Sequence, residues 1–392
     1  MMARPHFKIK NKFQRRSELY ENILTADILS DVCQRITGKN NYTIEVDNTG
    51  YNIGRLATLK YRGRISYISF SEIEIRSRNS SFQSFPSALV RYHQESNPNK
   101  RIYFYFLPST GNIETAYFMF MYRLMKTAGT RFLNETEHLN NQITPFNSVE
   151  DIIAYRNLNR GRNRGNISTY LTIDENNTLQ IYGKTYGANK YETTLLCLAI
   201  SEITTNKIEL YEIQEGNLRK LPASAREVIL ALGKISIISS DLILEREEYE
   251  KNDSLRSPAF IYNLLEKFGH KKCALCECEI PQIIQSAHIW PVARIKRTNN
   301  INQEQKLQSA IDGENGIWLC NNHHKLFDIN MILINEEGRI KYNSNIKENY
   351  ENYICDVTIN RQIRSEVLTP NFLQYLLRRN RSLDQRVYNF IE

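Results

Sequence analysis

The sequence predicts a protein of the α+β class, with a large N-terminal region of mixed α and β structure, a small zinc-stapled module near the C-terminus and a helical extension after it. Three observations favour this organisation. The chain has 392 residues, more than one ordinary hydrophobic core accommodates, which suggests two or three domains. Strand-like and helix-like patterns alternate along its first part. Closer to the C-terminus, two pairs of residues have the spacing of metal ligands.

The N-terminal region mixes both kinds of pattern. Apolar residues fall at helical spacing from Glu18 to Ile36, and the aromatic, Met-rich stretch IETAYFMFMYRLMK predicts a buried helix. Runs rich in β-forming residues predict strands in TIEVD, ATLKYRGRISYISFSEIEI and RIYFYFL. A hairpin is expected to follow in TYLTIDENNTLQIY, and another helix to begin near Glu192.

A charged run, EREEYEKNDSLRSP, separates this region from the rest and predicts a linker or an exposed helix end. We therefore expect domains over residues 1–255 and 256–345, followed by an extension over 346–392. The extension contains NFLQYLLRRNRSLDQRVYNFIE, which is typical of a helix with an apolar and a basic side. Its Arg378, Arg379 and Arg381 either remain in solvent around a packing helix or reach a phosphate.

Charge and composition limit the function classes. The formal net charge is +8 and the pI is about 9.0, which favours an anionic partner such as nucleic acid. No long apolar run or signal-peptide pattern is present, so we expect no membrane association and a cytoplasmic location. Cys33, Cys197 and Cys355 stand alone among apolar neighbours and are expected to be core thiols.

An arginine-rich segment, RNLNRGRNRG, is a candidate for contact with nucleic acid. Arg156, Arg160, Arg162 and Arg164 alternate with Gly and Asn, residues that favour turns and leave guanidinium groups free to approach phosphates or guanine edges. A loop that is simply solvated explains the pattern equally well.

The metal-ligand pairs predict a structural zinc site. Cys273 and Cys276 form a C-x-x-C pair, and Cys320 and His323 form a C-x-x-H pair. Two such pairs complete a tetrahedral site, which leaves no position for substrate, so this ion would stabilise a small module and take no part in catalysis. Cys278 is an alternative to Cys276, although the two-residue gap favours Cys276.

Between and after these pairs lie SAHIWPVARI, DGENGIWLC and NNHHKLFDINMILI. A strand ending at His288, a second strand from Gly316 to Cys320 and a helix from Asn321 onward would bring His288 and His324 to the two sides of one phosphate.

Taken in order, His288, Asn315 and His324 resemble the signature of the HNH endonuclease family, whose fold is two antiparallel strands and a helix around one metal ion. The likeness extends from Cys273 to Ile334. It implies that His288 is the general base, that His324 is a ligand of a catalytic Mg²⁺ or Mn²⁺, and that Asn315 orients the loop carrying His288. Since His323 and His324 are adjacent, they could exchange roles, but spacing from Cys320 favours His323 for zinc.

The remainder of the metal shell is less well defined by the resemblance. Many family members carry an acidic residue or a His immediately before the base, where this chain has Ala287. Asp328 lies four residues after His324, hence on the same helix face, and is expected to supply a second metal ligand. Asp312 is an alternative ligand, and a helix cap or salt bridge is the other role open to Asp328.

The resemblance implies a bacterial, cytoplasmic enzyme similar to type II restriction endonucleases, acting on double-stranded DNA as a homodimer, with residues 1–255 for recognition and dimerisation. Two alternatives are a modification-dependent HNH endonuclease and a zinc-bound DNA-binding protein without catalysis. A second nuclease centre at Glu72 and Glu74 is disfavoured, because Arg76 stands where such centres need Lys.

Overall fold

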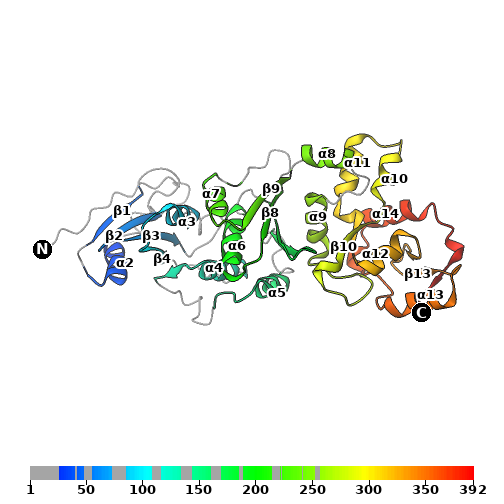
Figure 1. Cartoon of the computed structure of the whole chain (residues 1–392), viewed down its shortest axis with the longest axis horizontal. Coiled ribbons are helices and arrows are strands. Elements are labelled where there is room, and N and C mark those ends of the chain that lie inside the picture. Colours follow the sequence, from blue (N-terminus) through cyan, green and yellow to red (C-terminus); the bar gives the residue numbers. More distant parts are fainter. Residues whose placement is uncertain are drawn as a thin grey trace. The chain divides into compact units, whose positions relative to one another are not determined.

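The computed structural model is shown in Figure 1. It describes residues 26–39, 42–47, 55–72, 85–107, 116–133, 144–159, 169–184, 189–213, 221, 223–240, 242–251 and 257–392. Within these ranges no helix is both long and apolar enough to cross a membrane. The chain folds into two compact units. The first contains Met1–Thr169, Lys184–Thr205 and Arg219–Ile237, and the second contains Tyr170–Gly183, Asn206–Leu218 and Ile238–Glu392. The predicted domain boundary at 255 falls just outside the described ranges and remains a prediction.

The first unit is built on a five-stranded mixed sheet in the order β1-β2-β3-β4-β5. Its elements are α2 (Ala26–Thr37), β1 (Thr43–Val46), β2 (Leu56–Tyr61), β3 (Arg64–Glu72), α3 (Phe85–Gln94), β4 (Lys100–Leu107), α4 (Ala116–Thr127), β5 (Arg131–Phe132), α5 (Val149–Asn159), α6 (Asn189–Ile203) and α7 (Ala223–Ala231). Strands β1 to β3 are antiparallel, whereas β4 lies parallel to β3 and β5 parallel to β4.

Sequence chemistry explains the centre of this sheet. Arg62 and Gly63 both have positive φ, 46° and 73°, and form the two-residue turn that matches the twist of the β2–β3 hairpin. The middle of β3 and of β4 is continuously buried, as expected for parallel strands that are covered on both faces. The predicted Met-rich helix is α4, whose Met121 and Met125 are fully buried.

The second unit contains the metal-ligand motifs. Its elements are β6 (Tyr170–Ile173), β7 (Leu179–Lys184), β8 (Ile208–Ile213), β9 (Ile235–Ser240), α8 (Leu242–Lys251), α9 (Pro258–Phe268), β10 (Ile284–His288), α10 (Val292–Arg297), α11 (Gln303–Ile311), the 3₁₀ turn η3 (Gly313–Asn315), β11 (Gly316–Cys320), α12 (Asn321–Asp328), β12 (Ile332–Ile334), β13 (Ile340–Asn343), α13 (Glu348–Val357), α14 (Pro370–Asn380) and β14 (Tyr388–Phe390). Sheets form in the orders β6-β7-β8-β9, β10-β11 and β12-β13-β14.

Strands β10 and β11 are antiparallel and run directly into α12, which confirms the predicted arrangement of two strands and a helix. Ile284 pairs with Cys320 at one end of the ladder and His288 with Gly316 at the other. Trp318, at the centre of β11, is almost fully buried. The hairpin therefore places Cys320, a predicted zinc ligand, and His288, the predicted base, at opposite ends of the same two strands.

Two further helices complete the core around this hairpin. Helix α9 begins with Ser257, whose side chain accepts a hydrogen bond from the Phe260 amide, and Pro258 occupies its first position. Its Phe260, Leu264 and Leu265 are fully buried. From the C-terminal extension, α14 contributes Phe372 and Leu376 to the same hydrophobic cluster.

The prediction that the C-terminal helix continues toward residue 392 is wrong. Helix α14 ends at Asn380, and the chain then forms β14, which pairs with β13 through Lys341 and Phe390. The Asp384 side chain caps the intervening turn by accepting from the Arg386 amide. Sheet pairing and this local cap outweigh the helical pattern.

Gly313 of η3 packs directly against the backbone of α9, and we expect Gly313→Ala to destabilise the second unit. A Cβ atom there would lie 2.4 Å from the Asn263 carbonyl oxygen, which is backbone and has to move. Such overpacking costs about 1–3 kcal/mol. Urea unfolding followed by Trp fluorescence measures the loss, with the exposed Asn299→Ala as control. Unchanged stability in Gly313→Ala would contradict this packing.

Candidate metal and catalytic site

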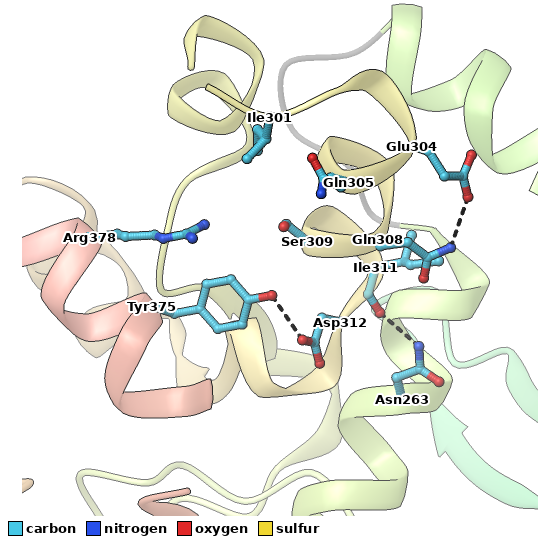
Figure 2. A pocket seen from close by; sticks show the side chains of 10 residues that line it. All are labelled: Asn263, Ile301, Glu304, Gln305, Gln308, Ser309, Ile311, Asp312, Tyr375 and Arg378. Atoms are coloured by element: carbon cyan, nitrogen blue, oxygen red, sulfur yellow. Dashed lines mark hydrogen bonds between the residues drawn. The ribbon is translucent and has the colours of Figure 1, made fainter. Parts of the chain in front are cut away.

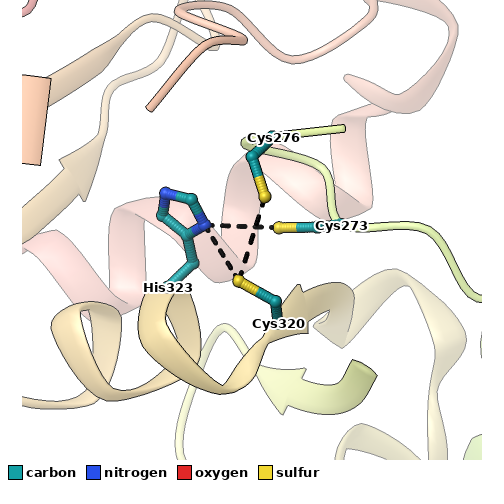
Figure 3. A group of neighbouring side chains, drawn as sticks. All are labelled: Cys273, Cys276, Cys320 and His323. Carbon is teal, nitrogen blue, oxygen red and sulfur yellow. Dashed lines mark hydrogen bonds between the residues drawn. The ribbon is translucent and has the colours of Figure 1, made fainter. Parts of the chain in front are cut away.

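Four side chains converge on a single point between the loop after α9 and the start of α12 (Figure 3). The Nδ1 atom of His323 lies 3.4 Å from the Cys273 Sγ and 3.2 Å from the Cys320 Sγ, and the Cys276 and Cys320 sulfurs are 3.9 Å apart. In tetrahedral zinc, bonds of roughly 2.3 Å to sulfur place neighbouring sulfurs about 3.8 Å apart. The donor set and its spacing therefore fit one zinc ion.

The backbone positions these ligands. The amide of Cys273 donates to the Cys278 carbonyl, which closes the loop, and the Ala274 amide donates to the Trp318 carbonyl, which joins the loop to β11. Cys320 ends β11 and His323 lies in the first turn of α12, so a C-x-x-H spacing at this junction directs both side chains to one side.

Hydrogen bonding and burial act differently on the three thiols of the cluster. Hydrogen bonding, first from Cys273 and then from His323, lowers the pKa of the Cys320 thiol, which favours the thiolate that binds metal. The hydrogen bond with Cys320 and burial raise the pKa of Cys273, and burial raises that of Cys276. The other ring nitrogen of His323, Nε2, lies 3.3 Å from the hydroxyl of the buried Thr358. This contact fixes the imidazole with Nδ1 toward the thiols.

His288, at the end of β10, is held in one tautomer. Its Nε2 lies 2.9 Å from the Ala310 carbonyl oxygen, which can only accept, so Nε2 carries the hydrogen and Nδ1 carries the lone pair in the neutral ring. Phe260 stacks on the imidazole, with ring centroids 3.9 Å apart and planes at 12°. The glycine opposite His288 permits this stacking, because a Cβ at Gly316 would lie 2.8 Å from the Phe260 ring.

Burial makes His288 a weakly basic imidazole in the free protein. The pKa of His288 is lowered to about 4: burial lowers it most, the Ala310 hydrogen bond opposes the shift, and the charge of His324 adds to it. The ring is therefore neutral at neutral pH, the form that accepts a proton.

Asn315 is fully buried and uses its whole amide to hold the loop after His288. Its Oδ1 accepts from the Trp290 amide at 2.7 Å, and its Nδ2 donates to the Trp290 and Ser309 carbonyls at 3.1 and 2.9 Å. The Asn315 carbonyl accepts from the Ile289 amide at 2.9 Å. Asn315 thus fixes the loop after His288 to the end of α11, the helix that also supplies the Ala310 carbonyl.

His324 and Asp328 form the second half of the predicted catalytic centre. The His324 Nε2 and the Asp328 Oδ2 are 3.7 Å apart on α12, and their side chains are 20% and 52% exposed. This separation is too long for a hydrogen bond. It is less than about 4.2 Å, twice a typical Mg²⁺–oxygen distance, so one ion can contact both atoms.

Asp312 has different partners. Its carboxylate accepts from the Tyr375 hydroxyl at 2.9 Å and from the Glu314 amide at 2.8 Å. It lines a cavity of about 480 Å³ between α11 and α14, where Tyr375 and Arg378 face Ser309 (Figure 2). Asp328, beside His324, is therefore the better candidate for a metal ligand.

Comparison with known families supports this interpretation of the geometry. The family model described as HNH endonuclease matches residues 273–335, which include the zinc cluster, both strands and α12. These residues form an HNH endonuclease domain. A domain of this family cleaves DNA with the help of a metal ion. No curated protein matches the chain.

The predicted zinc ligands of the HNH domain are confirmed as a spatial cluster, with Cys276 and not Cys278 as the fourth member. His323 is the histidine of that cluster, which leaves His324 outside it. Ala287, in the position where many relatives have a ligand, is fully buried in β10. The roles of His288, Asn315, His324 and Asp328 in catalysis remain predictions.

The first four residues of the arginine-rich segment end α5 at Asn159, and the rest, with Arg160, Arg162 and Arg164, lies outside the described residues. Arg156 lies on α5 and is 6% exposed, and its guanidinium forms an ion pair at 3.6 Å with Glu192 of α6, which is fully buried. In this structure the Arg156 side chain is directed into the first unit and not toward solvent. Glu72 of the disfavoured second centre ends β3, and Glu74 lies outside the described ranges.

Three groups that contact the zinc cluster or His288 were not predicted from the sequence. Phe260 on α9 and Thr358 after α13 lie outside the matched segment, and Ala310 contributes only its carbonyl. An apolar residue, a threonine and a backbone oxygen carry no signal in a single sequence.

We expect Cys320→Ser to lose zinc and Cys278→Ser to retain it. Cys320 is a member of the cluster, whereas Cys278, in the same loop as Cys273, contributes only a backbone carbonyl. Elemental analysis should find one zinc per chain in the wild type and in Cys278→Ser, and Cys320→Ser should melt at a lower temperature. Loss of zinc in Cys278→Ser and its retention in Cys320→Ser would show that Cys278, and not Cys320, binds the ion.

Phe260→Ala should raise the pKa of His288 from about 4 toward its ordinary value of 6.5, because burial is the largest cause of the shift. An NMR titration with histidine labelled at the ring carbons measures this directly. The variant Phe268→Ala on the same helix is the control. A pKa near 6.5 in the wild type would contradict the burial of His288.

Arg156→Met should destabilise the first unit by about 3 kcal/mol, since it removes the ion-pair partner of the fully buried Glu192 side chain. The double variant Arg156→Met/Glu192→Gln should recover part of the loss. Denaturant unfolding measures both. If Arg156→Met leaves stability unchanged but weakens DNA binding, its role is contact with DNA.

Proposed function

We propose that the protein is a site-specific endonuclease that hydrolyses phosphodiester bonds in double-stranded DNA, similar to type II restriction enzymes, with His288 as the general base. The observation that carries this proposal is the hydrogen bond from His288 Nε2 to the Ala310 carbonyl, because it leaves Nδ1 as the proton acceptor. Asn315 holds the loop that follows the base, and His324 and Asp328 lie on the adjoining helix.

His288 performs the first proton transfer. Its Nδ1 removes a proton from a water molecule as the water oxygen attacks phosphorus, and the resulting imidazolium keeps its Nε2 hydrogen bond to the Ala310 carbonyl. That hydrogen bond favours the charged ring, so it stabilises the imidazolium as it forms. The bond between phosphorus and the departing 3′ oxygen breaks, and the 3′ oxygen takes up a proton from solvent.

The second group of residues fits a divalent cation. Mg²⁺ or Mn²⁺ bound by His324 and Asp328 would supply positive charge opposite the phosphate and the departing oxygen. Both side chains are partly exposed, which leaves room for the water and phosphate ligands that such ions prefer.

We assign recognition and assembly to the chain outside the HNH domain. An HNH domain contacts chiefly the DNA backbone, so sequence recognition is assigned to residues 1–255. A net charge of +8 supports binding to a polyanion. Cleavage of both strands of a symmetric site requires two catalytic domains, so we propose a homodimer. An enzyme that protects a bacterial cell against foreign DNA acts in the cytoplasm.

Digestion of unmethylated phage DNA by wild type and His288→Ala, with Mg²⁺, with Mn²⁺ and with EDTA, tests the proposal. Wild type should yield discrete fragments with either metal. His288→Ala should be slower by at least roughly 100-fold, as expected for loss of a general base, and should bind DNA unchanged. His270→Ala, an exposed histidine after α9 and outside the matched segment, is the control and should cleave like wild type.

Three results would contradict the proposal in different ways. A smear of fragments indicates a nuclease without site specificity. Cleavage restricted to methylated DNA indicates a modification-dependent nuclease. Binding without cleavage in either metal, on methylated and unmethylated DNA alike, indicates a zinc-bound DNA-binding protein.

A further inference from the structure

Arg379 is a buried cation beside the proposed catalytic centre, outside the segment that matches the HNH family. It lies on α14 and is 3% exposed, so the prediction that it remains in solvent or reaches a phosphate is wrong. Its guanidinium carbon is 3.7 Å from the centroid of the Phe327 ring. Burying a charge costs several kcal/mol unless hydrogen bonds compensate. The hydrogen-bond partners of Arg379 therefore indicate what this buried arginine does.

The partners of Arg379 come from both halves of the proposed centre. Its Nη1 donates to the Ile289 carbonyl at 3.2 Å, one residue after His288. Its Nη2 donates to the Phe327 carbonyl, one residue before Asp328, and to the Asn330 side chain at 3.0 Å. One rigid guanidinium thus connects the end of the base-bearing strand to the end of the helix that carries the proposed metal ligands.

Arg379 adds a donor at the end of α12, where the Phe327 carbonyl also accepts from the Asn330 amide at 3.0 Å. The last carbonyls of a helix have no partner within it, and α12 is followed by Asn330 with φ of 57°, the left-handed conformation common after helix ends. Arg379 supplies hydrogen bonds both to the Phe327 carbonyl and to the Asn330 side chain. Burial lowers the pKa of Arg379 to about 10 against the opposing effect of the Asp328 carboxylate, so the side chain stays protonated at neutral pH.

We propose that Arg379 is a positioning residue for phosphodiester hydrolysis: it sets the separation between His288 and the His324–Asp328 pair by binding the backbone beside each. This rests on the proposed nuclease function. A planar fork with several donors suits this task, whereas a lysine ammonium cannot reach the same three acceptors with fixed geometry.

The test compares wild type with Arg379→Lys, Arg379→Met and the control Arg386→Met, which alters an exposed arginine paired only locally with Asp384. Steady-state cleavage should show kcat lowered about tenfold or more in Arg379→Met, typical of residues that orient metal ligands, with the KM for DNA unchanged. The Mn²⁺ concentration for half-maximal rate should rise. Arg379→Lys should be intermediate, and Arg386→Met should match wild type.

A structural measurement accompanies the kinetics. Histidine ring NMR without Mg²⁺ or Mn²⁺ should show altered His288 and His324 signals in both Arg379 variants and not in Arg386→Met. Zinc content should remain one per chain in all of them. If Arg379→Met does not fold, Arg379→Lys carries the comparison.

The outcomes separate the two proposals. Arg379 has only a packing role if Arg379→Met lowers the melting temperature but leaves kcat, the Mn²⁺ dependence and the histidine signals unchanged. If the wild type cleaves no DNA, the nuclease proposal fails and the NMR comparison decides alone: shifted His288 and His324 signals support the link between strand and helix, and unshifted signals overturn it.

Discussion

The hydrogen bonds of the Asn315 side chain are the constraint on which the rest of the HNH domain depends. A buried amide left without partners costs about 1–3 kcal/mol, so Asn315 has to find acceptors and a donor where it lies. It finds them on Trp290 and Ser309. Satisfying one amide therefore fixes the loop after His288 against the end of α11.

That end of α11 also determines the chemistry of the base. The Ala310 carbonyl receives the Nε2 hydrogen of His288, and Phe260 covers one face of the ring. The tautomer and the low pKa of His288 thus follow from backbone position and burial, and no neighbouring carboxylate is needed to orient the ring. The zinc cluster lies at the other end of the same strands and stabilises the hairpin from there.

The HNH domain is structurally larger than the segment that identifies it. Phe260 precedes the matched residues, and Thr358 and Arg379 follow them. Each contacts the zinc cluster or the proposed catalytic centre through a side chain. A fragment of residues 273–335 would lack all three side chains. Helices α9 and α14 therefore belong to the functional unit of the HNH domain.

The sequence predicted those parts of the site that depend on local spacing. C-x-x-C and C-x-x-H pairs, a strand ending at His288 and a helix from Asn321 are local patterns, and the structure contains each of them. Contacts between segments far apart in the chain could not be predicted, since the Phe260 stack and the Thr358 hydrogen bond connect distant residues of ordinary type. The C-terminal helix was predicted too long because sheet pairing of β14 overrides a helical pattern, and Arg156 gave no sign in the sequence that Glu192 would pair with it.

Anomalous diffraction from crystals grown with DNA and Mn²⁺, recorded at the zinc and manganese edges, tests the account most directly. We expect two separate ions: zinc bound by Cys273, Cys276, Cys320 and His323, and manganese bound by His324 and Asp328 on the side of the scissile phosphate opposite His288. Manganese bound instead by Asp312, or a single metal at the cysteines with no ion near His324, would contradict it.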